Sequence, residues 1–229
     1  MKLETHIHTG EVSSCSLVDA AGAVSRCVEL GYDGMVVTDH FAADSYPWHL
    51  RRRKKVHWEA RVDYFLRGYQ AARRAAPAGF AVILGMELRF GENGNDYLVY
   101  GLDEDFLYGH EDFDRLGIRR FSELARRSGL LLAQAHPFRF GTTITRPQYL
   151  DAVEVYNGHA GHVSHNEIAA HWAKYHGLIP LSGSDFHGGD SGDGTAPGGI
   201  ILPKPVSDSA ALARAIRAGE YTLLPQARE

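Results

Sequence analysis

The chain has 229 residues, of which 44% are hydrophobic and 23% are charged. These values are ordinary for a globular protein and exclude the disordered, fibrous and coiled-coil classes, and the length suits one domain over residues 1–229. A formal charge of −4 argues against a nucleic-acid partner. The absence of any run of about 20 apolar residues argues against a membrane span, and the polar start MKLETHIHTG does not resemble a secretion signal. We therefore expect a cytoplasmic protein without a membrane partner.

Short apolar segments alternate with amphipathic segments along most of the chain. In chain order, the apolar and helical periodicities predict strand 3–8, helix 16–31, strand 34–40, helix 56–76, strands 80–88 and 95–103, helix 121–129, strands 130–136 and 152–158, helix 165–177, strands 179–185 and 199–203, and helix 208–218. This alternation predicts parallel β/α units whose helices cover the strands. About seven such units favour a closed barrel over an open sheet.

Histidine is the unusual residue, with 13 copies in the chain. Histidines and acids stand at the C-terminal ends of the predicted strands: His6, His8, His40, Glu87, His136, Asp185 and His187. In β/α barrels and parallel sheets, the loops at these ends converge on one mouth. Residues two apart on a strand point to the same side, as His6 and His8 would, so both imidazoles can bind one ion. Imidazole and carboxylate donors suit zinc, manganese or iron, and the pattern predicts a multinuclear metal centre.

The alternative for any one of these histidines is a hydrogen-bonded or surface side chain. Six or more converging polar groups are a different case. Burying them without a cation would leave many of them unpaired, at a cost of about 1–3 kcal/mol each. We therefore favour the metal interpretation for the group as a whole.

Five strings resemble the successive motifs of the polymerase and histidinol phosphatase (PHP) family, in the family's order and over nearly the whole chain. These strings are HIHTGEVSSCS, VVTDH, GMEL, AHPFR and SGSDFH. The resemblance implies a distorted (β/α)7, TIM-like barrel with a metal site at the C-terminal rim of its strands. It also implies phosphoester hydrolysis at a centre of up to three divalent metal ions.

The resemblance also implies a ligand set. The first metal site would be formed by His6, His8, Glu87 and Asp185. The second would use two histidines and a residue of the loop after the first strand: His40, His187 and Glu11. The third would use Glu87, His136 and Asp96, the last in the string DYLVYG where the family commonly has histidine. Two to three ions of manganese, iron or zinc are therefore expected, and Asp96 favours the harder ones.

The charge of the expected centre suits a phosphate substrate. About three divalent cations and four carboxylates would leave the cluster with a charge of roughly +2, which attracts a phosphoryl dianion. The nucleophile would be a hydroxide bridging the metals.

Three further residues are candidates for catalysis. Arg139 is a candidate to contact phosphate oxygens, with a surface salt bridge as the alternative. His159 is a candidate to contact the substrate or protonate the leaving oxygen, and Asp39 to orient a ligand.

Other polar residues are given ordinary roles. Histidines without metal-site spacing, such as His162, are interpreted as surface residues, and Cys15 as structural. The basic run RRRKK at 51–55 is interpreted as a solvated segment, with contact to a phosphorylated substrate as the alternative. Specificity is assigned to the loops 41–58, 139–148 and 188–198.

The sequence thus predicts a metal-dependent phosphatase, a hydrolase of ester bonds, acting on a small phosphorylated metabolite or nucleotide. Two alternatives stay open. One is a nuclease or protein-tyrosine phosphatase of the same family. The other is a non-catalytic metal-binding module.

Overall fold

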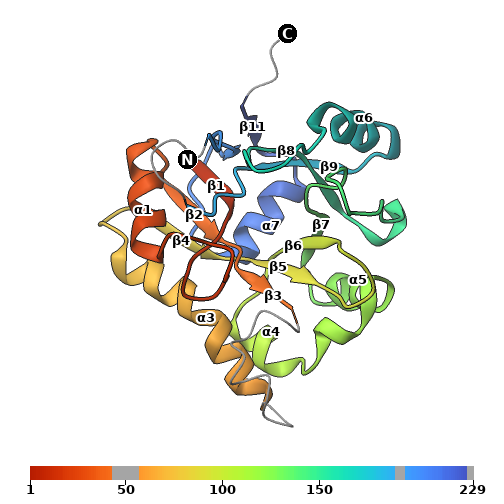
Figure 1. The fold of residues 1–229 in the computed structure, drawn as a ribbon, viewed down its shortest axis with the longest axis horizontal. Helices are drawn as coiled ribbons and strands as arrows, with labels where there is room; N and C mark the ends of the chain where they lie inside the picture. Colours follow the sequence, from red (N-terminus) through yellow and green to blue (C-terminus); the bar gives the residue numbers. More distant parts are fainter. Residues whose placement is uncertain (43–56, 189–193, 226–229) are drawn as a thin grey trace.

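The computed structural model describes residues 1–42, 57–188 and 194–225. The basic run at 51–55, residues 43–56 of the loop 41–58 and residues 189–193 of the loop 188–198 lie outside the described residues. Two sheets run through the centre of the molecule (Figure 1), with strand orders β11-β10-β1-β2-β4 and β3-β5-β6-β7-β8-β9. Their strands are β1 Lys2–Ile7, β2 Gly34–Val37, β3 His40–Phe41, β4 Ala81–Leu84, β5 Met86–Arg89, β6 Asp96–Tyr100, β7 Leu131–Gln134, β8 Ala152–Asn157, β9 Ile179–Gly183, β10 Gly199–Ile201 and β11 Thr222–Leu224.

Two of the predicted strands pass from one sheet to the other. The predicted strand 34–40 becomes β2 and β3, and the predicted strand 80–88 becomes β4 and β5. Gly85 lies at the second crossing, where an added Cβ would be 2.6 Å from Cγ1 of Val36. Glycine therefore permits the close approach of β2 at this point.

The strand directions are mixed, which differs from the prediction of uniformly parallel units. The pairs β1–β2, β2–β4, β3–β5, β7–β8 and β8–β9 are parallel. Strand β6 is antiparallel to both β5 and β7, and β10 is antiparallel to β1. The segment 90–95 is too short for a crossover helix, so β5 and β6 form a hairpin. As a result Asp96, the first residue of β6, pairs with Arg89 at the same edge where the parallel strands end.

The end of β1 comes together with the segment that follows β9. The amide of Asp185 donates to the carbonyl of His6 at 2.9 Å, and the amide of His8 donates to the carbonyl of Phe186 at 3.0 Å. Between them lies a single parallel bridge from Ile7 to Phe186. The structure thus shows a mixed α/β fold with parallel sheets. Strand pairing in the described residues does not close into one continuous ladder, unlike the (β/α)7 barrel that the resemblance implies.

Helices cover the strands from several sides. They are α1 Ala20–Glu29, α3 Trp58–Ala75, α4 Glu104–Gly109, α5 Gly117–Arg127, α6 Asn166–His176 and α7 Ser209–Arg217. Figure 1 shows α1 and α3 together on one side and α5 and α6 on the other. The sequence did not predict α4 or β11, because segments of six and three residues are too short to show a period. None of the helices in the described ranges has the length and apolar character needed to cross a bilayer.

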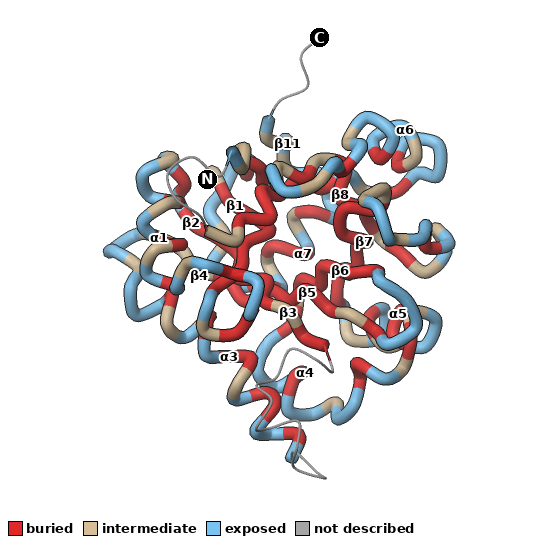
Figure 2. Tube along the Cα trace, viewed as in Figure 1, coloured by how far each residue is buried: buried red, intermediate tan, exposed pale blue. Residues whose placement is uncertain are grey.

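The buried core lies between the strands and their helices, and the outer helix faces are exposed (Figure 2). Helix α7 closes one end of the strands, where Leu212 and Ala213 join the buried cluster that contains Leu98 and Leu131. Arg217 of α7 donates to the carbonyl of Gly129, just before β7 begins. The predicted site residues follow the opposite ends of the parallel strands. Apolar packing therefore fills one end of the fold and leaves the other to polar groups.

Candidate metal centre

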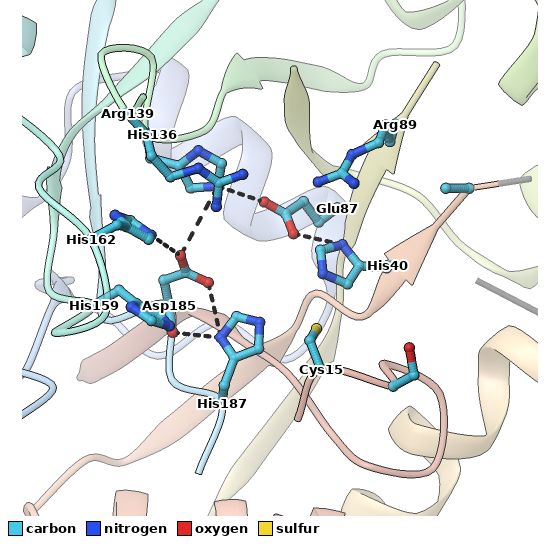
Figure 3. A pocket seen from close by; sticks show the side chains of 12 residues that line it. Cys15, His40, Glu87, Arg89, His136, Arg139, His159, His162, Asp185 and His187 are labelled. Carbon is cyan, nitrogen blue, oxygen red and sulfur yellow. Dashed lines mark hydrogen bonds and ion pairs between the residues drawn. The ribbon is translucent and has the colours of Figure 1, made fainter. Parts of the chain in front are cut away.

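The structure brings all seven of the predicted strand-end groups, together with Asp96, into one cluster that is largely buried. Its members are His6, His8, His40, Glu87, Asp96, His136, Asp185 and His187. They come from β1, β3, β5 and β6 and from the segments that follow β7 and β9. Residues far apart in the sequence thus share one mouth, as Figure 3 shows for those that line the pocket.

Three donor atoms of the first predicted site form a nearly equilateral triangle. Nε2 of His6 lies 3.1 Å from Nε2 of His8, and Oδ1 of Asp185 lies 3.2 and 3.3 Å from these two nitrogens. The circumradius of such a triangle is about 1.9 Å, so a point about 2.0–2.1 Å from all three atoms exists, which is the usual zinc–nitrogen distance. Glu87 adds carboxylate oxygens 3.4 Å from Nε2 of His6 and 3.3 Å from Nε2 of His8. This donor set fits a divalent transition metal.

Hydrogen bonds on the far side of the imidazoles fix which ring nitrogen carries the proton. Nδ1 of His6 lies 2.8 Å from Oε1 of the buried Glu154, and Nδ1 of His187 lies 2.8 Å from the carbonyl oxygen of Asp185. Each Nδ1–H donates to an oxygen, so Nε2 keeps its lone pair. Glu154 was not among the site residues predicted from the sequence. Its signal was an acid in the middle of the buried strand AVEVYNG.

Unpaired buried atoms also point to a ligand at this site. Among the described residues, three buried side-chain atoms have no hydrogen-bond partner, and all belong to this cluster or its edge: Nδ1 of His136, Nε2 of His162 and Oδ1 of Asp185. An unpaired buried polar group costs about 1–3 kcal/mol. The concentration of such atoms in one place is what binding of a cation and a substrate would explain.

The protonation states of His8, Asp185 and Glu87 are those of metal ligands. Burial, together with the neighbouring His187 and His40, holds the pKa of His8 well below its usual value, so this ring is neutral. Burial alone would raise the pKa of Asp185, but His6 and the other histidines hold it well below its usual range. Glu87 behaves in the same way beside His40 and His6. Neutral imidazole and ionised carboxylate are the ligand forms that metals bind.

The loop after β1 does not place Glu11 at the second predicted site. Its carboxylate instead accepts the backbone N–H of Ala20 at 2.9 Å, where it caps the start of α1. Glu11 is therefore the misplaced member of the predicted ligand set, because a favourable position for an acid existed at the helix N-terminus. Cys15 of the same loop lines the pocket instead, with its sulfur toward His40 and His187 (Figure 3).

The environment of Cys15 favours its thiolate. Burial acts to raise its pKa, but hydrogen bonding to His187 and His40 and the charges of these rings lower it to about 6. Cys15 was predicted to be structural, because spacing alone cannot show which loop residue turns inward. The structure places this thiol in the candidate site.

Asp96 lies in the cluster but has arginine partners. Its carboxylate is almost fully buried and accepts Nε and Nη2 of Arg89, both at 2.6 Å. Arg139 follows at 3.6 Å, whereas Nε2 of His136 is 3.9 Å away. Two guanidinium groups thus balance the negative charge of Asp96, which the sequence predicted to bind a third metal ion. Arg89 was missed because it stands in an ordinary strand, with no motif of its own.

The other two catalytic candidates and one unexpected histidine lie at the edge of the site. His159 stacks on His162 with ring centroids 4.5 Å apart and planes 4° from parallel. His162, which the sequence placed on the surface, has Nε2 3.6 Å from Oδ2 of Asp185. Asp39 accepts from the amide of Thr9 and from the hydroxyl of Ser13, each at 2.7 Å. Asp39 therefore holds the loop after β1 in place.

The pocket above the cluster has a volume of about 400 Å³. It is lined by histidines, arginines, acids and one thiol, among them Cys15, Arg89, Arg139, His159 and His162. This volume and this lining suit a small polar molecule that carries negative charge.

Comparisons with known proteins support the fold. Neither the protein-family models nor the curated proteins contain a match to this chain. Among solved structures, a two-domain protein from Bacteroides vulgatus described as containing a predicted PHP-like metal-dependent phosphoesterase has a TM-score of 0.69 and 17% identity. The alignment covers 97% of this chain and 64% of that one, so this chain spans just under two thirds of its length.

The chain has the fold of a PHP-like structure. PsfC from Pseudomonas syringae is also similar, with a TM-score of 0.62, 19% identity, and coverage of 93% of this chain and 86% of that one. An amidohydrolase from Chromobacterium violaceum, with bound sulfate and no metal, has a TM-score of 0.50 and 14% identity over 95% of this chain and 96% of that one. At these identities the likeness concerns the fold, and the chemistry must be argued from the residues.

Proposed function

We propose that this chain is a metal-dependent phosphoesterase that hydrolyses a small phosphorylated metabolite or nucleotide. The triangle formed by His6, His8 and Asp185 carries the proposal, because its dimensions match those of a divalent metal site. The triangle lies at the C-terminal ends of β1 and β9, which each have a parallel neighbour, and such ends hold the active sites of β/α folds; this supports the proposal. A single domain with a distorted (β/α)7 barrel and a cytoplasmic location belong to the same proposal.

The chain's own residues would bind the metal ions in two groups. His6, His8, Glu87 and Asp185 would hold one ion, and the imidazoles of His8, His40 and His187 face a second position. Manganese, iron or zinc at these positions would neutralise phosphoryl charge and lower the pKa of bound water. The ion pair between Asp96 and Arg89 supports two ions over three, because the arginine already supplies positive charge there.

Arginines at the rim would orient the substrate. Arg89 and Arg139 line the pocket and stand beside the same buried carboxylate. Guanidinium groups match the oxygens of a phosphoryl dianion and can donate two hydrogen bonds each. Both side chains are partly exposed, so they can contact a ligand without leaving Asp96 unpaired. This lining favours a phosphate ester over a neutral amide.

His159 is placed to donate a hydrogen bond to the substrate. Its Nδ1 accepts the amide of Gly161 at 2.8 Å, so a neutral ring carries its proton on Nε2. Burial lowers the pKa of His159, which keeps the ring neutral at pH 7. The ring would therefore donate from Nε2 to a phosphoryl or leaving-group oxygen.

The proposal is tested with protein loaded separately with manganese, zinc and iron. A panel of phosphorylated metabolites, a phosphodiester, an oligonucleotide and a phosphotyrosyl peptide separates a metabolite phosphatase from a nuclease and from a protein-tyrosine phosphatase. We expect turnover of a free monoester, and loss of this turnover in His8→Ala and Asp185→Asn with the fold retained. Glu11→Gln is the matched control, because this acid caps a helix outside the cluster.

Two outcomes would overturn the proposal. Equal turnover in His8→Ala and the parent chain would show that the cluster is not the active site. Metal binding without hydrolysis of any phosphoester would favour the non-catalytic module.

A further inference from the structure

We propose that Cys15 is a metal ligand, whose sulfur joins His8, His40 and His187 at the second cation position. The inference rests on the proposed metal centre and specifies the donors of one of its sites. It assigns to Cys15 the position for which the sequence nominated Glu11.

Three imidazoles already define this position. The candidate donor atoms of His8, His40 and His187 all lie within 4.8 Å of one another. The ring of His8 stacks between the other two, 4.5 Å from His40 and 4.2 Å from His187. Three neutral donors leave the charge of a divalent ion uncompensated, so a negatively charged fourth donor would be favourable here.

Three acids can be considered for that fourth donor: Glu11, Glu87 and Asp185. Oε2 of Glu87 lies 2.8 Å from Nδ1 of His40 and 3.3 Å from Nε2 of His8. Glu11 is turned away, with both carboxylate oxygens on the amide of Ala20. Oδ1 of Asp185 is buried and has no hydrogen-bond partner; it lies 3.3 Å from Nε2 of His8 and 3.4 Å from Nδ1 of His187. This oxygen is aimed at the place where the imidazoles meet and marks it as a ligand position. Asp185 and Glu87 are both shared with the first site, so the second site still lacks a negatively charged donor of its own.

The loop that carries Cys15 is fixed to the elements that carry the histidines. On one side of Cys15, the hydroxyl of Ser13 donates to Asp39, next to His40. On the other side, the hydroxyl of Ser16 and the amide of Leu17 donate to the carbonyl of His187 at 3.1 and 2.6 Å. Both flanks of Cys15 are thus held to the second site. Figure 3 shows the sulfur pointing into the space beside His40 and His187.

A sulfur donor changes which ion the position prefers. Thiolate and imidazole together favour zinc or iron over manganese and magnesium. Binding would release the thiol proton to solvent and form a sulfur–metal bond, with no change in oxidation state. The second position would then be softer than the first, where carboxylates contribute half of the donors.

Cobalt substitution tests the inference, because sulfur ligation gives a charge-transfer band in the near ultraviolet that nitrogen and oxygen ligands lack. The full chain is loaded with cobalt(II) and compared with Cys15→Ser and Cys27→Ala. The chain has only two cysteines, and Cys27 is buried in α1. We expect the band in the parent and in Cys27→Ala, and its loss in Cys15→Ser while the visible cobalt bands remain.

The possible failures are distinguishable. Visible cobalt bands without a charge-transfer band in the parent would overturn the role of Cys15 and leave the metal centre standing, as would a band that persists in Cys15→Ser. No cobalt binding at all would overturn this inference together with the proposed function.

Thiol alkylation gives a second readout that does not depend on cobalt. Cys15 is exposed and Cys27 is buried, so iodoacetamide should modify Cys15 in the metal-free chain. We expect zinc to protect Cys15 in the parent and to protect it much less in His40→Ala, measured by intact mass. Equal alkylation of the parent with and without zinc would contradict ligation.

Discussion

Single side chains decide whether the imidazoles at this site can bind a cation, and Glu154 has the clearest such role. Its carboxylate accepts Nδ1–H of His6 at 2.8 Å, the amide of His136 at 2.8 Å and the side-chain amide of Asn157 at 2.9 Å. Glu154 therefore orients the side chain of His6 and the backbone of His136, which are both predicted ligands. It acts through these residues and does not reach the substrate.

We expect Glu154→Gln to weaken metal binding about 10- to 100-fold, the usual effect of losing a group that orients a ligand histidine. The amide keeps the size of the side chain but removes the charge that favours Nδ1–H on His6. Calorimetric titration with zinc measures the affinity, with Glu11→Gln as the control of equal chemistry outside the cluster. An unchanged affinity in Glu154→Gln would contradict the positioning role.

At this scale the sequence was informative wherever a polar residue followed a strand. His6, His8, His136 and Asp185 could be nominated because strand ends are recognisable from apolar runs. Loop residues have no regular spacing that shows which side chains point inward. The choice between Glu11 and Cys15 depends on which side chain turns inward between residues 9 and 16, and the position of His162 depends on the turn that follows β8. Neither is determined by spacing.

At the scale of elements, the hairpin of β5 and β6 shows what periodicity omits. The apolar pattern located both strands, but direction depends on the connection between them. Six residues between strands permit a hairpin and exclude a crossover helix. The length of this connection therefore already indicates that β6 is antiparallel to β5. It has a consequence for the site, because it brings Asp96 to Arg89.

The contact between α3 and the short helix Phe113–Arg115 depends on a buried ion pair. Arg61 donates to the carboxylate of Asp114 through both terminal nitrogens, and both side chains are nearly inaccessible. Arg61 also lies 5.0 Å from the ring of Trp58. We expect Arg61→Met to lower the free energy of unfolding by about 3–5 kcal/mol, because it leaves Asp114 buried with its charge uncompensated.

Urea unfolding of the metal-free protein measures this loss. Arg115→Met is the control, because Arg115 is 72% exposed and its pair with Asp112 should contribute less than about 1 kcal/mol. A further replacement, Asp114→Leu in the Arg61→Met background, should restore part of the stability. Equal effects of the two single replacements would contradict the assignment.

Cys27 is buried in α1, and its thiol should make the free energy of unfolding depend on pH in the alkaline range. Burial, with a contribution from Glu4, raises the pKa of Cys27 far above its ordinary value of 9.0. Below pH 9.0 the thiol is protonated in both the folded and unfolded states and contributes no dependence. Above it the unfolded chain releases the proton and the folded chain keeps it, so stability falls by at most about 1.4 kcal/mol for each pH unit.

Urea midpoints measured at increasing pH above 9.0 test this dependence. Cys27→Ala removes the titrating group and should reduce the slope, whereas Cys15→Ser should leave this contribution in place. Burial likewise raises the pKa of Tyr32 above 10.0, so part of the slope should persist in Cys27→Ala. An identical slope in the parent and in Cys27→Ala would contradict the contribution of Cys27.

For the whole molecule, the sequence predicted an α/β fold with its site at one end of the strands, because parallel units of alternating strand and helix have few other solutions. The contact between β1 and the segment after β9 was harder to predict from the sequence. The contact of β1 with the segment after β9 consists of a short bridge at Ile7 and Phe186, and no apolar pattern specifies it. The hydrogen bond from the amide of Asp185 to the carbonyl of His6 belongs to the same contact, so the contact that joins these strands also brings two proposed ligands together.

Metal binding should therefore stabilise the molecule as a unit. The proposed ligands of the first site belong to β1, β5 and the segment after β9, and an unfolded chain cannot hold His8, Glu87 and Asp185 together. An ion that binds only the folded state at 100 times its Kd adds about 2.7 kcal/mol. For about 230 residues this corresponds to a rise in Tm of about 5–10 °C. We expect this rise with zinc or manganese and its reversal by a chelator, measured by calorimetry. In His8→Ala the same additions should shift Tm by much less, and an equal shift in both proteins would mean that the ions bind elsewhere.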